Sequence, residues 1–402
     1  MPSNVPLLYE IPLSYLLVML CVLFIFIILP MIILPRFLPN LMTNTSNNLG
    51  WIEGLRGFAA ILVAFNHAPL VLINLRYIPK VFILSQHDFS FLVFLGSLGV
   101  QVFFCITGML FTHKLMSVEQ VDWTLFFKKR LLRIVPGYFF ACTVALMIAF
   151  FITRSHHNIS TLCVNIFELL SFGLLPLPTL NGFELNRLLG VNWTLAMEWR
   201  FYLILPILFV LFQSARKFTM IVLVGIALGD MMWNSMSSWV YFVSGALCAP
   251  LMYRERQKSW TILAYLGLLF TMIVLYQHWE NYSNYHIQRW GIMTVLFASL
   301  VILKPKFLSL KWVMAMGKVS YSFYLLHAMT LFALLGLCNH YIVDITLISA
   351  VSFTLLVGLS LTMATLFATF SFVYIEMPFM TNLKLSRRKV KNPDVFAVEN
   401  QA

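Results

Sequence analysis

Long apolar runs alternate with short polar segments along the whole chain. A helix needs about 20 mainly apolar residues to cross the roughly 30 Å hydrocarbon core of a bilayer. The pattern therefore predicts an all-α, polytopic membrane protein with about 11 transmembrane helices. The predicted spans are Leu13–Leu34, Leu55–Leu75, Phe91–Thr112, Gly137–Ile152, Trp193–Phe212, Phe218–Met232, Trp239–Tyr253, Trp260–Gln277, Trp290–Leu303, Val319–Leu337 and Thr346–Phe372.

The apolar stretch Leu162–Pro178 is predicted to be a non-spanning or re-entrant helix, because it contains Glu168 and two prolines. Charge supports this choice. With the N-terminus outside and eleven spans, 21 Lys and Arg residues fall in inside loops and five in outside loops. Such a bias is what the positive-inside rule expects. A twelfth span at Leu162–Pro178 would destroy this charge bias. With eleven spans and an outside N-terminus, the C-terminus is predicted to be cytoplasmic.

Composition fixes the class of protein. The chain is 60% hydrophobic and 10% charged, which excludes a soluble domain of 402 residues. Its net charge of +12 does not indicate nucleic-acid binding, because the basic residues gather in short loops between apolar spans. The six cysteines lack metal-ligand or disulfide spacing, and nothing in the sequence indicates a metal.

Three regions are predicted. Residues 1–50 hold a first span and a polar linker, and the span is expected to be retained rather than cleaved as a signal peptide. Residues 51–380 form the main membrane domain, and residues 381–402 form a basic cytoplasmic tail. Gly225 and Gly229 lie four residues apart and predict a close helix crossing.

Three ionisable residues fall in the middle third of the predicted bilayer, on three different spans: His67, Glu198 and His327. Such groups are costly in lipid unless they pair or line a polar cavity, so they indicate a functional site. A purely stabilising hydrogen-bond network is the alternative.

A basic entrance is predicted at the inner surface. Arg56 precedes His67 by eleven residues, about 16 Å along a helix and on nearly the same face. Arg130 and Arg133 share a face at another helix entrance. Paired guanidinium groups grip phosphate oxygens, although ordinary positive-inside flanking explains most other basic residues here.

Six segments in order resemble motifs of the membrane acyltransferase-3 family, over about Trp51–Phe379. The first contains an arginine followed by a histidine eleven residues later. The matching segments are Ile52–His67, Gly99–Gly108, Arg130–Pro136, Trp193–Tyr202, Gly317–His327 and Tyr374–Phe379. The chain departs from the family pattern at five positions: Glu53, Gln101, Thr107, Arg200 and Met377. Gln101 stands where an acidic residue is usual, and with Arg200 it puts acceptor specificity in doubt.

The resemblance implies an O-acyltransferase that moves an acetyl group from cytosolic acetyl-CoA to a hydroxyl of a surface or lipid-linked carbohydrate, such as lipopolysaccharide O-antigen. The implied location is the bacterial inner membrane, and the partners are the glycan and membrane lipids. Some relatives carry an added hydrolase-like domain, which this chain is too short to contain. The ten-helix family core would therefore be preceded here by one extra span.

The resemblance implies the following roles for the candidate residues. His67 acts as base or nucleophile, with Glu198 and His327 as further catalytic candidates, and the three arginines bind the phosphates of acetyl-CoA. The supporting candidates are Glu53, Asn66, Thr107 and Tyr321. A transporter of a lipid-linked or anionic sugar is the alternative function, because intramembrane histidines also suit proton-coupled transport. A purely structural scaffold is a third alternative, but it would not need ionisable groups at mid-depth.

Overall fold

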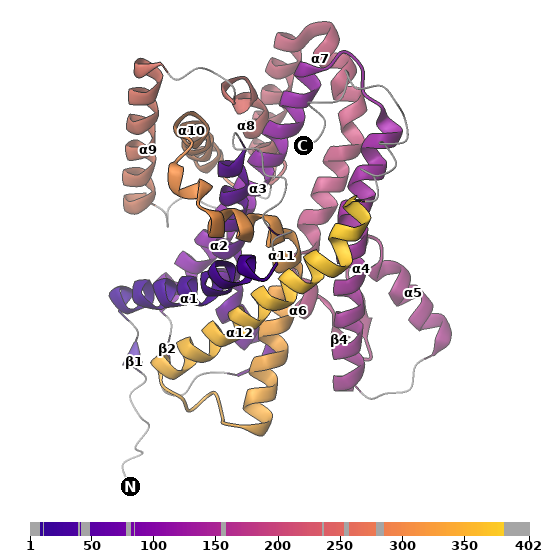
Figure 1. The fold of residues 1–402 in the computed structure, drawn as a ribbon, viewed down its shortest axis with the longest axis vertical. Coiled ribbons are helices and arrows are strands. Elements are labelled where there is room, and N and C mark those ends of the chain that lie inside the picture. The colour runs from indigo at the N-terminus through magenta and orange to yellow at the C-terminus, as the bar shows by residue number, and fades with distance from the viewer. Residues whose placement is uncertain are drawn as a thin grey trace.

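A computed structural model describes residues 9–10, 12–38, 41, 49–77, 82–83, 85–153, 158–234, 237–252, 257–278 and 285–381. Figure 1 shows that helices make up almost all of this part of the chain. The predicted cytoplasmic tail and most of the predicted 40–50 linker lie outside the described residues. The helices are α1 (Leu13–Ile33), α2 (Gly50–Leu75), α3 (Gln86–Ser117), α4 (Trp123–Thr153), α5 (Ile159–Leu169), α6 (Asn186–Leu189), α7 (Asn192–Trp233), α8 (Val240–Cys248), α9 (Lys258–His278), α10 (Ile287–Leu303), α11 (Lys311–Tyr341) and α12 (Ala350–Phe370).

The all-α membrane class is confirmed. Eight helices of the described chain are long and apolar enough to cross a membrane. The segments that contain α8 and α10 are apolar but shorter. The 42-residue α7 contains a break at Ala215, where φ is −151° and ψ is 62°. Its two halves correspond to the two separate spans that the sequence predicts there.

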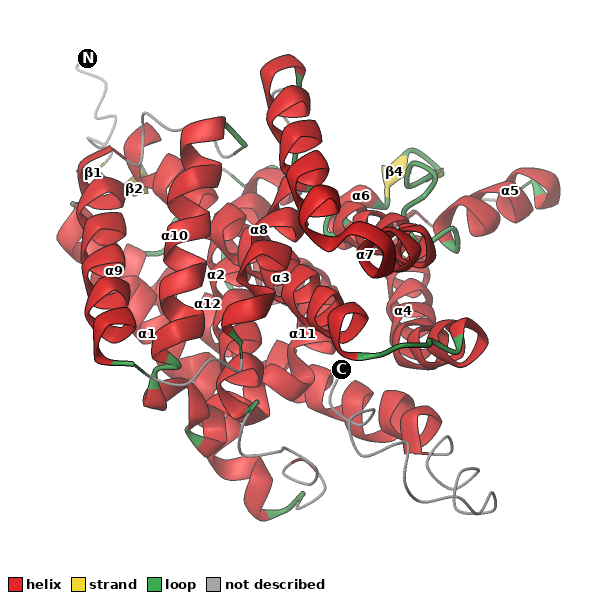
Figure 2. Ribbon diagram, turned by 90° about the horizontal axis from the view of Figure 1, so that it is seen from above, coloured by secondary structure: helices red, strands yellow, loops and turns green. Residues whose placement is uncertain are grey.

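The segment predicted not to span contains α5, which has 11 residues and a length of about 16 Å. That is about half the thickness of the hydrocarbon core, so α5 cannot cross alone. Two views place α5 projecting from the side of the molecule opposite α9 (Figures 1 and 2).

A small hairpin follows α5. Strands β3 (Thr179–Leu180) and β4 (Phe183–Glu184) pair antiparallel across Asn181 and Gly182, whose φ angles are 50° and 81°. Positive φ at both turn residues is the type I′ pattern, for which Asn-Gly is the strongest sequence signal. The sequence analysis missed this hairpin. A second strand pair, β1 (Tyr9–Glu10) and β2 (Phe82–Ile83), is parallel.

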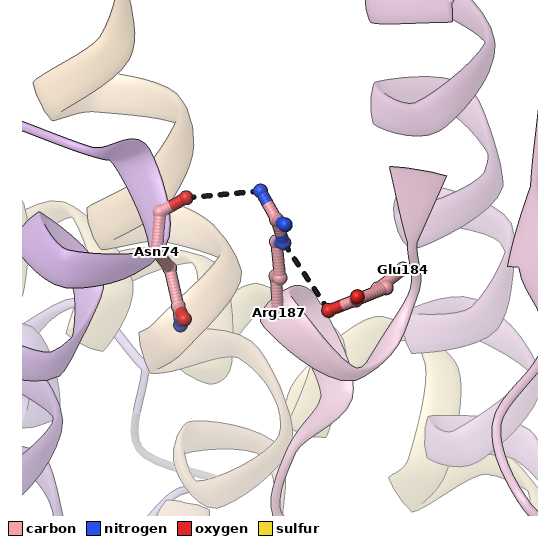
Figure 3. A network of polar contacts seen from close by, with 3 residues as sticks. All are labelled: Asn74, Glu184 and Arg187. Atoms are coloured by element: carbon pink, nitrogen blue, oxygen red, sulfur yellow. Dashed lines mark hydrogen bonds and ion pairs between the residues drawn. The ribbon is translucent and has the colours of Figure 1, made fainter. Parts of the chain in front are cut away.

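Arg187, in α6, ties the hairpin to the end of α2 (Figure 3). Its Nη1 donates to the backbone oxygen of Asn74 at 3.2 Å, and its Nε donates to Glu184 at 3.5 Å. A cation at the C-terminus of a helix satisfies an otherwise unpaired carbonyl and complements the helix dipole. Phe183 of β4 also packs against Phe332 of α11.

The centre of the molecule is the pair α2 and α11, which have the most extensive contact of any two helices. A Cβ on Gly317 would lie 1.8 Å from the backbone oxygen of Glu53, and one on Gly57 would lie 2.7 Å from the backbone nitrogen of Gly317. Only glycine permits this approach. Helix α3 packs on the other side of α2, where Gly99 contacts Ala59.

The first predicted span is α1, and it packs against α12. Thr362 of α12 donates to the backbone oxygen of Phe26 at 2.8 Å, and the Phe26 ring lies against Gly358. The added N-terminal helix is thus docked on the rest of the bundle.

Three predictions need correction. Helix α4 begins at Trp123 and continues through Pro136, so the predicted inside loop His113–Pro136 shrinks to Val118–Asp122. Proline is tolerated inside membrane helices, and close to this one Tyr321 of α11 donates to the Ile134 oxygen.

The last predicted span, Thr346–Phe372, begins later and ends later than expected. Helix α12 starts at Ala350 and runs on through a π-helical segment, Ser371–Glu376. Such wide turns are frequently found at functional sites.

Gly225 and Gly229 are the third correction. A Cβ added at either glycine would have no described atom within 4 Å, so the two residues do not form the predicted helix crossing.

Candidate active site

Two histidines predicted from the sequence meet at the centre of the bundle. Nδ1 of His67 on α2 lies 2.6 Å from Nε2 of His327 on α11. The centroids of the two rings are 4.9 Å apart and their planes are 18° from parallel, so the rings meet nearly edge to edge. His327 is fully buried, whereas His67 is only half-buried. His67 is therefore the ring that a substrate can reach, and His327 lies behind it.

The hydrogen bonds assign the proton positions in the neutral pair. Nδ1 of His327 lies 2.9 Å from the backbone oxygen of Phe323, which can only accept. Nδ1 of His327 must then carry the hydrogen, and its Nε2 is an acceptor. Nδ1 of His67 donates to that acceptor, so Nε2 of His67 keeps its lone pair. The geometry presents an unprotonated imidazole nitrogen at a partly accessible position.

Helices α7 and α11 each contribute one hydroxyl of a pair beside the rings. Thr194 Oγ1 of α7 lies 3.0 Å from the hydroxyl of Tyr324 of α11, whose ring centroid is 6.2 Å from that of His327. The Phe323 ring also contacts the His327 ring, with centroids 5.5 Å apart. Sequence analysis passed over Thr194 and Tyr324, although both lie inside quoted motifs and carry polar groups within apolar spans.

Glu198 points to a different set of partners from the one expected. Its Oε2 accepts from the hydroxyl of Tyr202 at 2.8 Å, and it interacts electrostatically with Arg56 and Arg130. In the described part of the chain, it makes no hydrogen bond to either histidine. The carboxylate thus belongs to the arginine group rather than to the histidine pair.

The three predicted arginines gather, and they lie deeper than expected. Arg56 interacts electrostatically with Arg133, and Arg130 with both. Arg130 and Arg133 are the eighth and eleventh residues of α4. The guanidinium of Arg130 is buried, 5.0 Å from the ring centre of Phe111. Three guanidinium groups that lie close together suit an anionic ligand.

The supporting candidates occupy different places. Glu53 interacts electrostatically with Arg56. Asn66 packs against Gly96 of α3, next to His67. Tyr321 donates to the Ile134 oxygen at 2.9 Å, beside Arg133. Thr107 is half-buried on α3 and makes no described hydrogen bond to the histidines.

Glu376 is a buried acid that sequence analysis did not select. It accepts from the hydroxyls of Ser322 and Ser371 and interacts electrostatically with Arg133. It lies in the π-helical segment, against Gly137 of α4. The available signal was an ionisable residue inside a quoted motif, four residues after the last predicted span.

Comparison of the sequence with known protein families identifies the class of protein to which the chain belongs. A family model described as an acyltransferase domain matches residues 49–372. The chain belongs to the acyltransferase-3 family. Helix α1 precedes the matched region, whereas all residues of the candidate site except Glu376 lie within it.

Curated relatives are distant and agree with the family. The chain is 26% identical over 298 residues to ORF330 of Acidianus two-tailed virus, whose name proposes an acetyltransferase, covering 69% of this chain and 81% of the relative. It is 25% identical over 339 residues to the O-acetyltransferase OatA of Staphylococcus aureus strain NCTC 8325, covering 73% and 50%. The chain thus spans about half the length of OatA. No solved structure matches the chain.

The family makes the chain an acyltransferase, and its helices fit an integral membrane protein. The alternative of a transporter finds no support in these comparisons.

Proposed function

We propose that this membrane O-acyltransferase moves an acetyl group from acetyl-CoA to a hydroxyl of a surface or lipid-linked carbohydrate, with lipopolysaccharide O-antigen as the leading candidate. The observation that carries the proposal is the bonded pair of His67 and His327, with Nε2 of His67 free to accept a proton. Hydroxyl groups need such a base to become effective nucleophiles.

In the proposed reaction, Nε2 of His67 takes the proton of the acceptor hydroxyl as its oxygen attacks the thioester carbonyl. The carbon–sulfur bond then breaks, and the CoA sulfur leaves with the proton held by His67. In a variant, Nε2 itself attacks the thioester, the carbon–sulfur bond breaks, and CoA leaves as a thiolate from an acyl-histidine. The acceptor hydroxyl then takes the acyl group, its proton passes to the thiolate, and the carbon–nitrogen bond breaks to free the imidazole. Both routes need the same accessible nitrogen.

Acetyl-CoA would bind through its phosphates at Arg56, Arg130 and Arg133. Arg56 and His67 lie on one continuous helix, about 16 Å apart along its axis. An extended pantetheine arm has a similar length, so phosphates at the arginines would place the thioester near His67. Glu198 would then help to hold the arginines in place through its electrostatic attraction to Arg56 and Arg130.

The donor would enter from the cytoplasm and the acceptor from the opposite side, in a bacterial inner membrane with a cytoplasmic C-terminus. The charge distribution between apolar runs supports this orientation. No group of three or more His, Cys, Asp or Glu residues suited to a metal occurs in the described part of the chain.

The test is acetyl transfer by purified protein in lipid nanodiscs. Labelled acetyl-CoA is supplied with lipopolysaccharide, and the label in the glycan is measured. We expect His67→Ala to lower the rate by about 10²–10⁴-fold, as loss of a general base does. The matched control is His340→Ala, which removes an exposed histidine from α11. Wild-type turnover by His67→Ala would refute the proposed chemistry.

A further inference from the structure

The hydroxyl pair of Thr194 and Tyr324 has no part in the proposed reaction, yet it lies between the two groups that do. Thr194 is about one turn from Glu198 on the same face of α7, and Glu198 belongs to the arginine group. Tyr324 is about one turn before His327 on α11. The pair therefore lies at a level between the expected phosphate-binding end and the histidine pair.

Tyr324 also lies on the same side of α3 as the reactive ring. The centroid of its ring is 5.8 Å from that of Phe103 on α3. Phe103 is four residues after Gly99 and shares its helix face, and Gly99 contacts Ala59 of α2. This face of α3 is therefore the one turned toward α2, which carries His67, so α3 does not separate the phenol from the imidazole.

Tyr324 is partly accessible where its neighbours along the helix are not. All other residues from Ser322 to Phe332 are buried. The phenol is nevertheless enclosed by α3 and α7, through its contacts with Phe103 and Thr194. His67 is likewise only half-buried in the middle of its helix. A close-packed core leaves no accessible surface between helices, so these side chains offer surface to a molecule inside the bundle.

The hydrogen bonds of the pair determine what the phenol offers to a ligand. Thr194 Oγ1 donates its single hydrogen to the backbone oxygen of Val191 at 2.8 Å. Its 3.0 Å contact with Tyr324 must then use the phenol hydrogen, with the Thr194 oxygen as acceptor. Within the described chain, the phenol makes no other hydrogen bond. The Tyr324 oxygen therefore keeps a free lone pair, which suits an N–H donor.

The arm of acetyl-CoA carries such a donor at a matching distance. Two carbon atoms join its sulfur to the nearest amide nitrogen, so sulfur and nitrogen lie about 4 Å apart. Tyr324 is three residues, or about 4.5 Å, from His327 along the axis of α11. It lies toward the arginine group, because Gly317, earlier on α11, contacts α2 next to Arg56. A thioester beside His67 would therefore place this amide beside the phenol.

We propose that Tyr324, held by Thr194, binds the amide N–H nearest the thioester of acetyl-CoA. This inference rests on the proposed acyl transfer. The phenol oxygen accepts from that N–H while its own hydrogen stays on Thr194, so binding breaks no hydrogen bond inside the protein. The arginines hold the phosphates at one end of the donor, and Tyr324 holds the end that reacts. Fixing both ends keeps the thioester carbonyl within reach of His67.

The experiment measures binding of acetyl-CoA and of its ester analogue to the full-length protein in nanodiscs. In the analogue, an oxygen atom replaces the N–H nearest the thioester, so the arm keeps its length and its carbonyl. The ratio of the two dissociation constants should be about tenfold larger for the wild type than for Tyr324→Phe, as loss of one hydrogen bond predicts. A merely structural effect of the substitution would weaken both ligands equally and leave the ratio unchanged.

The control is Tyr341→Phe, the same substitution at an exposed tyrosine at the end of α11. It should retain the wild-type ratio. The same ratio in the wild type and in Tyr324→Phe would overturn the inference, and a wild type that does not bind acetyl-CoA would overturn both this inference and the proposed function. A ratio that depends on Tyr324, without acetyl transfer to any glycan, would instead contradict the proposed function and leave the donor site intact.

Discussion

His327 has a role that its own burial makes clear. It is 0% exposed, and both of its nitrogens are engaged, one by the Phe323 oxygen and one by His67. It cannot reach a substrate, so in the proposed reaction it is a positioning residue. It would hold the His67 ring in place and select the tautomer in which Nε2 of His67 keeps its lone pair.

Replacing His327 by Ala should lower kcat by about 10²-fold, because His67 then loses its orienting acceptor and its tautomer is no longer fixed. KM for acetyl-CoA should hardly change. His327→Gln should recover part of kcat, since its amide oxygen can accept from Nδ1 of His67. The measurement is the initial rate over a range of acetyl-CoA concentrations.

His340→Ala serves as the control for the same helix and residue type. An effect of His327→Ala confined to KM would contradict a positioning role, and so would failure of His327→Gln to exceed the alanine variant.

At the residue scale, the members of the candidate site and their partners could be predicted only in part. Burial of ionisable groups in apolar runs singled out His67 and His327, and the structure joins them. Glu198 does not lie beside the two histidines as expected. The depth of a residue in the bilayer does not determine which way its side chain points around its helix. Arg289, which is fully buried in the first turn of α10, was counted as an outer-loop cation, since a single sequence does not show that its helix begins inside the bundle.

At the scale of elements, α2 and α11 determine the site. The two helices touch at Gly57 and Gly317, and each histidine lies ten residues after its glycine. Equal offsets mean that the helices run in the same direction with matched rise. The backbone contact at the glycines therefore sets the distance between the two rings.

Gly317→Ala should disrupt this contact, because its methyl group would meet the Glu53 oxygen at 1.8 Å. We expect a loss of about 1–3 kcal/mol in stability, as overpacking typically costs. We also expect about a 10²-fold loss of transfer rate, since displacements near 1 Å have that effect. Thermal unfolding in nanodiscs and transfer rates provide the measurements.

Gly225→Ala is the matched control, since that glycine has open space around it. It should leave both the unfolding temperature and the rate close to wild type. A Gly317→Ala protein with the wild-type rate would show that the helix contact does not set the geometry of the site.

Most elements were predictable because hydrophobic length alone identifies a membrane helix. Boundaries set by tertiary contacts were not. Pro136 is a normal helix boundary in sequence, yet α4 continues through it, where Tyr321 of α11 binds the Ile134 oxygen. The break in α7 at Ala215 was predicted indirectly, as a loop between two spans.

At the scale of the whole molecule, the arginine group and the histidine pair lie at different depths of one bundle. Arg56 and His67 share α2, and α4 brings Arg130 and Arg133 to the same level as Arg56. In the proposed reaction, the positive group is where the donor phosphates bind. The charges of the loops favour a cytoplasmic position for this end.

Sided membrane vesicles test this arrangement. Inside-out vesicles that contain the protein should bind labelled acetyl-CoA, whereas sealed right-side-out vesicles should not. Arg130→Ala combined with Arg133→Ala should reduce binding at least tenfold, because two phosphate-binding groups are lost.

Arg216→Ala combined with Lys217→Ala removes the same charge from exposed positions of α7 and should leave binding unchanged. Equal binding to vesicles of both orientations would contradict the expected sidedness. Full binding by the double arginine variant would exclude these residues as the donor site.

The parallel course of α2 and α11 also bears on how the protein responds to its lipids. A bilayer with longer or shorter acyl chains makes helices tilt or slide to match its thickness. Because the backbones of α2 and α11 are in contact at Gly57 and Gly317, the two helices resist sliding past each other, so they tilt as one unit and keep the 2.6 Å separation of the imidazoles. Catalysis built on this pair would keep working as an organism remodels its fatty acids.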